Sequence, residues 1–221
     1  MEAQELMDSN DQGSIARAIR NLNTIAKQLK ERRNQQGALT LASTQVKITL
    51  EEETHNATDV RMYQMVETNY LIEEFMLLSN ISVAEKIYER FPALSILRRH
   101  TQPKTADLQV LREILEGMGY ELKWDTSREL ADSLDKVTRK SDDFFNKLVR
   151  ILTTRCMNEA TYFCSADHDV REFYHYGLAA PFYTHFTSPI RRYADVLVHR
   201  LLVAAIDLEP LPSFMSKYLP I

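Results

Sequence analysis

The sequence predicts a helix-rich α+β fold, in which long helices surround part of a mixed sheet. Apolar residues recur at helical spacing over two long segments, 14–37 and 67–90, and a shorter segment, 46–50, alternates like a strand. Glycine is scarce, with 5 in 221 residues, so few tight turns are expected. With 44% hydrophobic residues, the chain has enough apolar surface for one sizeable core or for part of a larger one.

The first predicted helix runs from about Ser14 as N-cap to Gly37 at the C′ position. Its apolar face carries residues at steps of three and four: Ile15, Ile19, Leu22, Ile25 and Leu29. Its cations are expected on a solvated face rather than on a phosphate track: Arg17, Arg20, Lys27 and Lys30.

Two strands are predicted next, at 46–50 and, more weakly, at 60–66. The helix predicted at 67–90 is apolar on several sides, which indicates burial. Asn69, Glu73 and Asn80 interrupt it along one stripe, and buried polar groups of this kind need partners.

Beyond Pro92 the pattern predicts a helix at 106–118, a short strand at 121–124, and helices at 127–140 and 142–163. Cys156 and Cys164 lie eight residues apart in what looks like a helical segment. Their spacing fits neither a zinc knuckle nor a disulfide framework, so we interpret them as inert buried thiols.

Composition limits the partners. No apolar run approaches the roughly 20 residues that span a bilayer, and the first residues resemble no signal peptide, so we expect a soluble intracellular protein without a membrane partner. A net charge of -4 argues against a wholly basic nucleic-acid surface, although local cationic clusters can still contact phosphates.

The segment 183–200 carries the clearest chemical signal. Ser188 is predicted to cap a helix whose first residue is Pro189, which places Arg191 and Arg192 in the first turn. Positive charge is disfavoured there, and an anionic partner such as phosphate would resolve the conflict. Asp195 lies four residues after Arg191, and His199 four after Asp195. An ordinary capped helix with ion pairs explains Asp195, but not the two arginines.

These residues resemble a known family. The run Thr187-Ser188-Pro189-Ile190-Arg191, with the basic residue, Tyr193, Asp195 and His199-Arg200 that follow, is similar to the signature of the RNB (RNase II-type) exoribonucleases. The stretches 37–41 and 72–84 resemble the members of that family that act in the eukaryotic exosome. The resemblance covers about 2–206 and is weakest between 92 and 140.

The resemblance implies a partial RNB nuclease domain over residues 1–221, from an enzyme that hydrolyses single-stranded RNA from its 3′ end. It also implies magnesium as cofactor of the complete enzyme, and exosome core subunits as partners. The implied locations are the nucleus, including the nucleolus, and the cytoplasm. DNA is not an expected ligand.

The family's residue roles carry over by position. Arg191 matches an active-site arginine that contacts phosphate and supports the charged transition state. Glu73 matches an acidic residue that contacts the terminal nucleotides, and Leu41 stands where bacterial relatives stack an aromatic ring on the last base. Further RNA contacts are expected from Ser188, Arg192, Tyr193, His185 and Asn80. From the residues alone, the stripe containing Asn80 is equally well an internal hydrogen-bond network or the lining of an RNA channel.

The chain departs from the family at the metal site. The family holds its metals with an aspartate, five further residues and then Asp-x-Asp-Asp, and this chain has no such cluster, because the pairs at 142–143 and at 167 and 169 lack the spacing. The family's cold-shock modules and RNA-binding OB fold are likewise not expected within these 221 residues. We therefore expect this chain to hold no metal and to be inactive alone. The alternatives are a non-catalytic RNA-binding paralogue and a helical interaction protein derived from the family.

Overall fold

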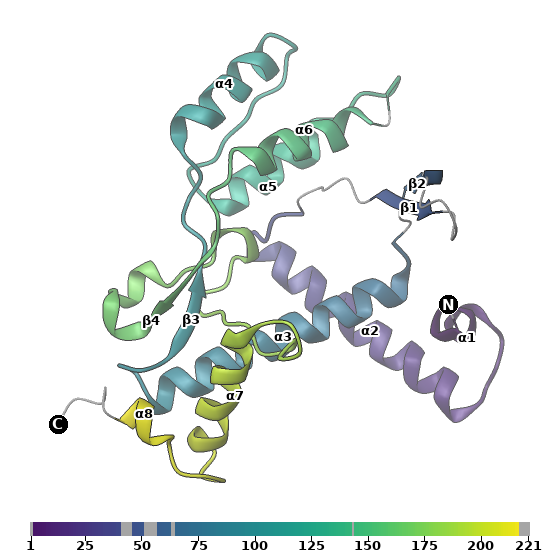
Figure 1. The fold of residues 1–221 in the computed structure, drawn as a ribbon. Helices are drawn as coiled ribbons and strands as arrows, with labels where there is room; N and C mark the ends of the chain where they lie inside the picture. Colours follow the sequence, from purple (N-terminus) through teal and green to yellow (C-terminus); the bar gives the residue numbers. More distant parts are fainter. Residues whose placement is uncertain (1, 41–45, 51–56, 63–64, 143, 217–221) are drawn as a thin grey trace.

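The fold is seen in a computed structural model, which describes residues 2–40, 46–50, 57–62, 65–142 and 144–216 (Figure 1). The helix-rich α+β class is confirmed. The helices are α1 (Glu2–Asp8), α2 (Ser14–Gln35), α3 (Glu67–Arg90), α4 (Thr105–Glu116), α5 (Ser127–Lys136), α6 (Phe145–Arg155), α7 (Tyr193–Ala205) and α8 (Ser213–Ser216). The strands are β1 (Val46–Leu50), β2 (Ala57–Met62), β3 (Ile96–Arg99) and β4 (Thr161–Cys164).

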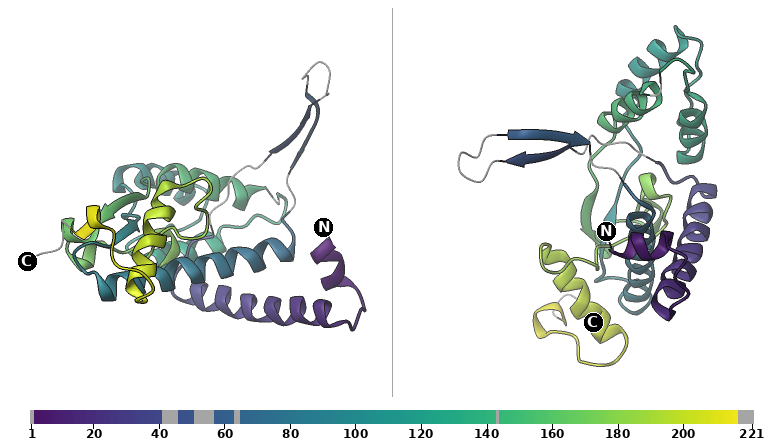
Figure 2. Two further views of the ribbon diagram at one scale, coloured as in Figure 1. Left: turned by 60° about the horizontal axis from the view of Figure 1, so that its bottom comes forward. Right: turned by 90° about the vertical axis from the view of Figure 1, so that its right-hand side faces the viewer.

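The described strands form two antiparallel pairs, β1 with β2 and β3 with β4, and not the single mixed sheet expected. The β1–β2 hairpin projects from the rest of the chain (Figure 2). Its second strand begins earlier than the predicted 60–66, and the predicted strand at 121–124 is not formed. No helix of the described residues is both long and apolar enough to cross a bilayer.

The two longest helices, α2 and α3, pack side by side (Figure 1). The predicted end of α2 is confirmed: Gly37 has φ +96°, and the next residue, Ala38, donates its N–H to the Arg33 carbonyl at 3.1 Å. At the other end, the residue before the first turn is Gly13, not Ser14.

The face of α2 that packs on α3 is not the apolar stripe. Ala16, Asn23 and Ala26 are buried, whereas Ile15 is 68% exposed and Ile25 46% exposed. The small alanines allow the two backbones to approach closely.

Arg17 and Lys27 are exposed, as expected of a solvated face, but cations of α2 also contact α3. Lys27 pairs with Glu67 of α3 at 2.9 Å, and the Lys30 ammonium lies 3.8 Å from the centre of the Tyr70 ring. Arg33 binds the buried Glu74 at 2.5 Å. The buried alanines of α2 are thus joined by one buried ion pair, Arg33 with Glu74, and by contacts at the rim of the helix pair.

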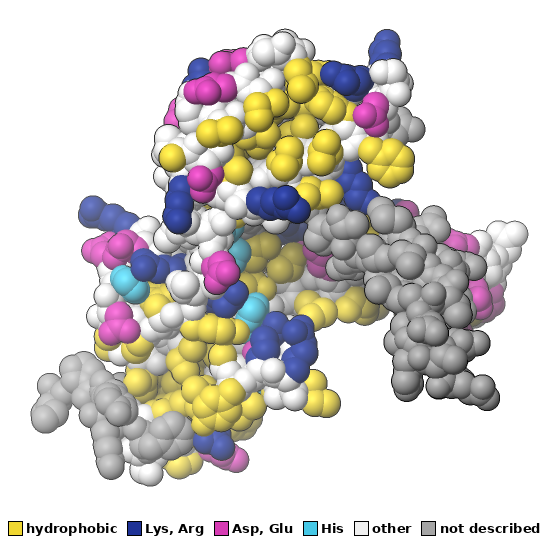
Figure 3. Space-filling view, turned by 45° about the horizontal axis from the view of Figure 1, so that its top comes forward, with side chains coloured by type: hydrophobic (Ala, Val, Ile, Leu, Met, Phe, Trp, Pro, Cys, Tyr) yellow, Lys and Arg dark blue, Asp and Glu magenta, His cyan; other side chains and the backbone are white. Residues whose placement is uncertain are grey.

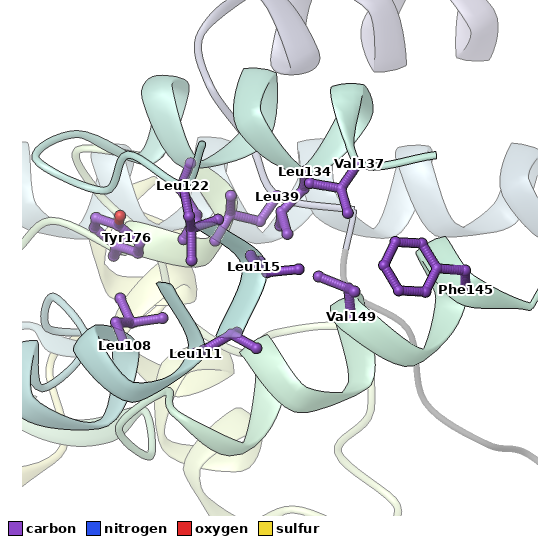
Figure 4. Close-up of a cluster of buried hydrophobic side chains, with 11 residues drawn as sticks. Leu39, Leu108, Leu111, Leu115, Leu122, Leu134, Val137, Phe145, Val149 and Tyr176 are labelled. Atoms are coloured by element: carbon purple, nitrogen blue, oxygen red, sulfur yellow. The ribbon is translucent and has the colours of Figure 1, made fainter. Parts of the chain in front are cut away.

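Two hydrophobic cores organise the chain. The first joins α4, α5 and α6, the helices at the top of Figure 1, and is drawn in Figure 4. Its buried members are Leu39, Leu108, Leu111, Leu115, Leu122, Leu130, Leu134, Val137, Phe145, Val149 and Tyr176. The second lies between α3, β3 and α7, with buried members Val83, Ala84, Ile87, Leu94, Leu97, Phe173, Val198, Leu201 and Met215. Burial of α3 is only partial, since Ile72 is 57% exposed and Leu78 41%.

The helix predicted at 142–163 is wrong beyond residue 155. Thr153 and Thr154 turn their hydroxyls back to carbonyls one turn earlier, a pattern that weakens a helix, and α6 ends at Arg155. Residues 161–164 instead pair with β3, so that Tyr162 faces Arg98 across the two strands. Cys164 is thus in a strand, and both cysteines are free and half-buried. Helix α5 likewise ends at Lys136 and not at 140.

Candidate nucleic-acid interface

The segment after β4 lies along the free edge of β3. The Arg98 N–H donates to the Tyr183 carbonyl at 2.8 Å, and the Thr184 hydroxyl donates to the Ile96 carbonyl at 2.7 Å. These bonds anchor the loop that runs from His185 to Arg192, and this loop leads into α7.

Helix α7 begins at Tyr193, four residues later than predicted. Ser188 is not its N-cap, because the residue before the first turn is Arg192. The Ser188 N–H donates instead to the Asp195 carboxylate at 2.7 Å. The N–H groups of Arg191 and Arg192 both point to the Ser188 carbonyl at 3.2 Å, which makes residues 188–192 a turn ahead of the helix.

Asp195 anchors this turn. It is fully buried and receives both Nε and Nη2 of Arg192 at 2.7 Å, in addition to the Ser188 N–H. Burial raises the pKa of the Asp195 carboxyl, but the hydrogen bonds from Arg192 and Ser188 outweigh burial and leave that pKa below its ordinary value. The predicted pairing of Arg191 with Asp195 is therefore wrong, because Arg192 occupies the carboxylate.

Arg191 is exposed at the tip of the turn. Its Nη2 lies 3.5 Å from the Ser188 hydroxyl, and no carboxylate of the described residues forms an ion pair with it. Its neighbours Ile190 and Tyr193 are 97% and 70% exposed. The turn thus presents one available guanidinium, flanked by two apolar side chains, while the adjacent Arg192 is engaged in the fold.

Asn80 ties this loop to α3. It is 3% exposed; its amide donates to the Tyr183 hydroxyl at 3.0 Å, and its carbonyl accepts the Phe186 N–H at 2.9 Å. The Phe186 carbonyl accepts from His199 Nε2 at 2.8 Å, so His199 also holds the loop. Asn80 therefore belongs to an internal hydrogen-bond network, which is one of the two interpretations of the polar stripe. It holds the loop against α3, and its buried amide group is not accessible to RNA.

His185 lies half-buried between the loop and the β3–β4 pair. Its Nδ1 is 2.5 Å from the Tyr162 hydroxyl. Burial, and then the charges of Arg192 and Arg98, lower the pKa of His185 to about 4, so its imidazole is neutral near pH 7. Figure 3 shows Lys or Arg and His side chains gathered beside a hollow on this face of the molecule.

The remaining candidates are dispersed. Glu73 is exposed on α3, about 10 Å along the helix from Asn80. Its neighbour Glu74, which the sequence did not single out, is the buried carboxylate of this helix, and it pairs with Arg33. Leu41 lies outside the described residues.

A pocket of about 430 Å³ lies elsewhere, between α2, α5 and α6. Its charges are already used within the fold: Arg150 pairs with Asp135 at 2.5 Å, and Arg128 pairs with Asp132 at 3.1 Å. Such a paired lining does not favour an anionic ligand there.

Within the part of the chain that the structure describes, no three His, Cys, Asp or Glu side chains lie close enough together to hold a metal ion. The donor set of these residues therefore does not fit the magnesium that the resemblance implies.

The fold places an exposed arginine on a turn that a buried aspartate holds, and comparison with known proteins identifies the family. The sequence matches the RNB domain over residues 1–207. This chain belongs to the RNB domain family.

Several similar relatives are named as exosome exonucleases. The exosome complex exonuclease RRP44 homolog A of Arabidopsis thaliana is 50% identical over 214 residues, which cover 96% of this chain and 23% of that protein. The human exosome complex exonuclease RRP44 is 50% identical over 220 residues, 98% of this chain and 23% of that protein. The chain thus spans about a quarter of the length of these relatives.

Solved structures share the fold. RNase R of Mycoplasma genitalium, solved in complex with ribose-methylated single-stranded RNA, matches with a TM-score of 0.80 and 21% identity over 98% of this chain and 34% of that one. Yeast Ssd1, described as a pseudonuclease, matches with a TM-score of 0.71 and 28% identity over 97% of this chain and 26% of that one.

Proposed function

We propose that this chain is the part of a 3′-to-5′ exoribonuclease that receives the backbone of single-stranded RNA, with Arg191 as the phosphate-contacting and transition-state-supporting side chain. The observation that carries the proposal is the turn 188–192, in which a buried Asp195 binds Arg192 and leaves Arg191 exposed. The human and plant relatives, named as exosome exonucleases, support the same reading at 50% identity.

The geometry suits phosphate. An exposed guanidinium presents a planar fork of donors that matches two phosphate oxygens, and its charge is not cancelled by a neighbouring carboxylate of the described residues. Because the turn is held by three hydrogen bonds of 2.7 Å to Asp195, the backbone that carries Arg191 is fixed before RNA arrives. Such preorganisation is what electrostatic transition-state stabilisation needs.

The sequence lacks the family's aspartate cluster, so the chemistry of hydrolysis belongs to a metal site outside this set of residues. Alone, the chain would bind RNA without cleaving it. In the complete enzyme, the partners would be exosome core subunits, and the protein would work in the nucleus, including the nucleolus, and in the cytoplasm.

A second candidate function is RNA binding without catalysis. The specific observation in its favour is the likeness to yeast Ssd1, a pseudonuclease, at 28% identity over 97% of this chain. In that case Arg191 would hold RNA in its ground state and would support no reaction.

RNA binding is the first test. Fluorescence anisotropy with a labelled single-stranded RNA should give saturable binding by the wild-type chain, with no magnesium-dependent release of nucleoside monophosphates. Arg17, an exposed arginine of α2, is the matched control for substitutions of the exposed Arg191. The Arg17→Ala variant should bind RNA as the wild-type chain does. Absence of RNA binding would overturn the proposal, and release of monophosphates would contradict the expected inactivity.

A complementation assay separates the two functions. The chain is joined to the aspartate-bearing half of a related RNB domain, and single-turnover cleavage is measured beside RNA affinity. For a catalytic role, Arg191→Ala should slow cleavage about ten- to a hundredfold, with little loss of affinity, since a charge-assisted hydrogen bond is withdrawn from the transition state. Arg191→Lys should restore cleavage only in part. A defect confined to affinity would favour the binding protein.

A further inference from the structure

The exposed face of the β3–β4 pair carries an arginine stacked on a tyrosine. Arg98 and Tyr162 are directly opposite each other in the antiparallel register, and the Arg98 guanidinium carbon lies 4.7 Å from the centre of the Tyr162 ring. The alternate residue Leu97 points into the core at 1% exposure. Arg98 and Tyr162 therefore lie on the outer face of the β3–β4 pair, and the opposite face of these strands packs on the hydrophobic core.

His185 fixes the tyrosine. Its Nδ1 is hydrogen-bonded to the Tyr162 hydroxyl at 2.5 Å, and the two rings meet edge to face with their centres 5.5 Å apart. Tyr162 nevertheless remains 41% exposed. An aromatic ring that is held in place and still exposed binds a second ring at low conformational cost, because it loses little freedom on contact.

Positive charge in this region is only partly balanced. Arg99 and Arg192 have carboxylate partners, Glu172 and Asp195, but Arg98 and Arg191 pair with no carboxylate of the described residues. The Arg98 charge helps to lower the pKa of three histidines, His100, His175 and His185, although burial is the larger cause in each. A site with this potential favours a ligand that brings negative charge.

A nucleotide unit of a single strand satisfies both properties. Its base offers a flat ring to an exposed aromatic side chain, and its phosphate offers charge to an arginine, which is how single-stranded nucleic acids bind without sequence selection. An acidic peptide would meet the charge but would leave the fixed aromatic ring without a matching surface.

We propose that Tyr162, backed by Arg98 and held by His185, forms a subsite on which one base of a single-stranded RNA stacks, beside the phosphate that Arg191 receives. This subsite rests on the proposed function and adds to it a base contact from β3 and β4. The site reads the presence of a base and not its identity, because every base has a stacking face.

The test combines protein variants with abasic RNA. A series of single-stranded RNAs, each lacking the base at one position, is titrated against the wild-type chain, Tyr162→Ala and Tyr162→Leu. Stacking predicts that both variants bind intact RNA about 5- to 150-fold more weakly. It also predicts that the loss disappears for the RNA that lacks the base at one particular position. Tyr162→Leu keeps the apolar bulk of the side chain and so guards against a folding defect.

Two controls sharpen the result. Tyr162→Phe retains the ring and should bind within about threefold of the wild type, since stacking supplies most of the contact. Phe144→Ala removes an aromatic ring that is 70% exposed beside α6, outside the proposed site, and should leave RNA binding unchanged.

The charge of Arg98 is tested separately. Arg98→Gln should reduce the salt dependence of RNA binding by about one released counterion.

The outcomes separate the two proposals. Equal losses for Tyr162→Ala at every abasic position, or no loss at all while wild-type binding persists, would overturn the subsite and leave the proposed function standing. If the wild-type chain binds no RNA, both proposals fail. Loss confined to one abasic position supports the subsite.

Discussion

Breaking the ion pair between Asp195 and Arg192 should destabilise the fold, and the two halves of the pair should not cost the same. Asp195 is fully buried and accepts three hydrogen bonds of 2.7 Å, whereas the Arg192 side chain retains 18% exposure. Removing one partner of a buried pair costs about 3 to 5 kcal/mol. Arg192→Ala should lie at the upper end of that range, because the carboxylate left behind has no access to water.

Asp195→Ala should lie at the lower end, because water can reach the arginine that remains. It also leaves the Ser188 N–H without its acceptor, which adds about 1 kcal/mol if that group stays buried. The double variant should cost clearly less than the sum, by about 2 kcal/mol, since neither charge is then left alone.

The assay is urea unfolding followed by far-UV circular dichroism, with the four proteins of the cycle compared at one pH. The pH dependence gives a second check. The folded pKa of Asp195 is lowered, so the stabilisation is fully present above about pH 4, the unfolded value, and is lost as pH falls through the lowered folded pKa. The reasoning would be refuted if the losses in free energy of unfolding of the two single variants add up to that of the double variant. It would also be refuted if Asp195→Ala is within about 0.5 kcal/mol of the wild type.

Three further predictions concern the rest of the fold. Burial first, and then the neighbouring His100 and Arg98, lower the pKa of His175 to about 3, so the free energy of unfolding should decrease as pH falls from about 6.5 toward that value, and His175→Gln should flatten this slope in thermal melts. Gly37→Ala should cost more than Gly119→Ala in urea unfolding, because both glycines have positive φ but only at Gly37 would a Cβ lie 2.8 Å from the Arg128 backbone nitrogen; equal costs would argue against the close contact. Leu130→Ala should cost about 2 to 5 kcal/mol, since Leu130 is fully buried in the first core, whereas the exposed Val110→Ala should change stability by less than about 0.5 kcal/mol.

Local pattern predicted the long helices well and their packing poorly. The periodicity of 14–37 and the positive φ needed at Gly37 are properties of the segment itself, and the structure agrees with both. Which face of α2 is buried depends on Glu74 and Glu67 of another helix, and no pattern within α2 contains that information. Ile15 and Ile25 therefore looked like core residues and are exposed.

The β3–β4 pair could not be predicted for a related reason. Its two strands are four residues each and lie more than 60 residues apart in the chain, so each is stabilised by a partner that local propensity cannot see. Residues 161–163 were assigned to a helix, and because of that error Tyr162 was not among the candidate residues.

At the candidate site, the sequence singled out the segment 183–200 but could not assign the roles of the residues within it. Arg191 and Arg192 are adjacent and chemically identical, and only the position of Asp195 decides that Arg192 is structural. Asn80 was open to two interpretations until its partners, Tyr183 and Phe186, were seen. The expected RNA contacts of Glu73, His185, Ser188 and Tyr193 stay predictions.

The division of the apolar residues into two cores has a consequence for how this chain opens. Loop 185–192 and the β3–β4 pair pack on the second core, through Phe163 and Phe186, and share little with the core of α4, α5 and α6. Parts of a protein that are built on separate cores can open separately, and their backbone amides then exchange with solvent hydrogen independently. A ligand on the loop should therefore slow exchange in α3 and α7 by mass action, while amides of α4 keep the opening rate that they have in the free protein.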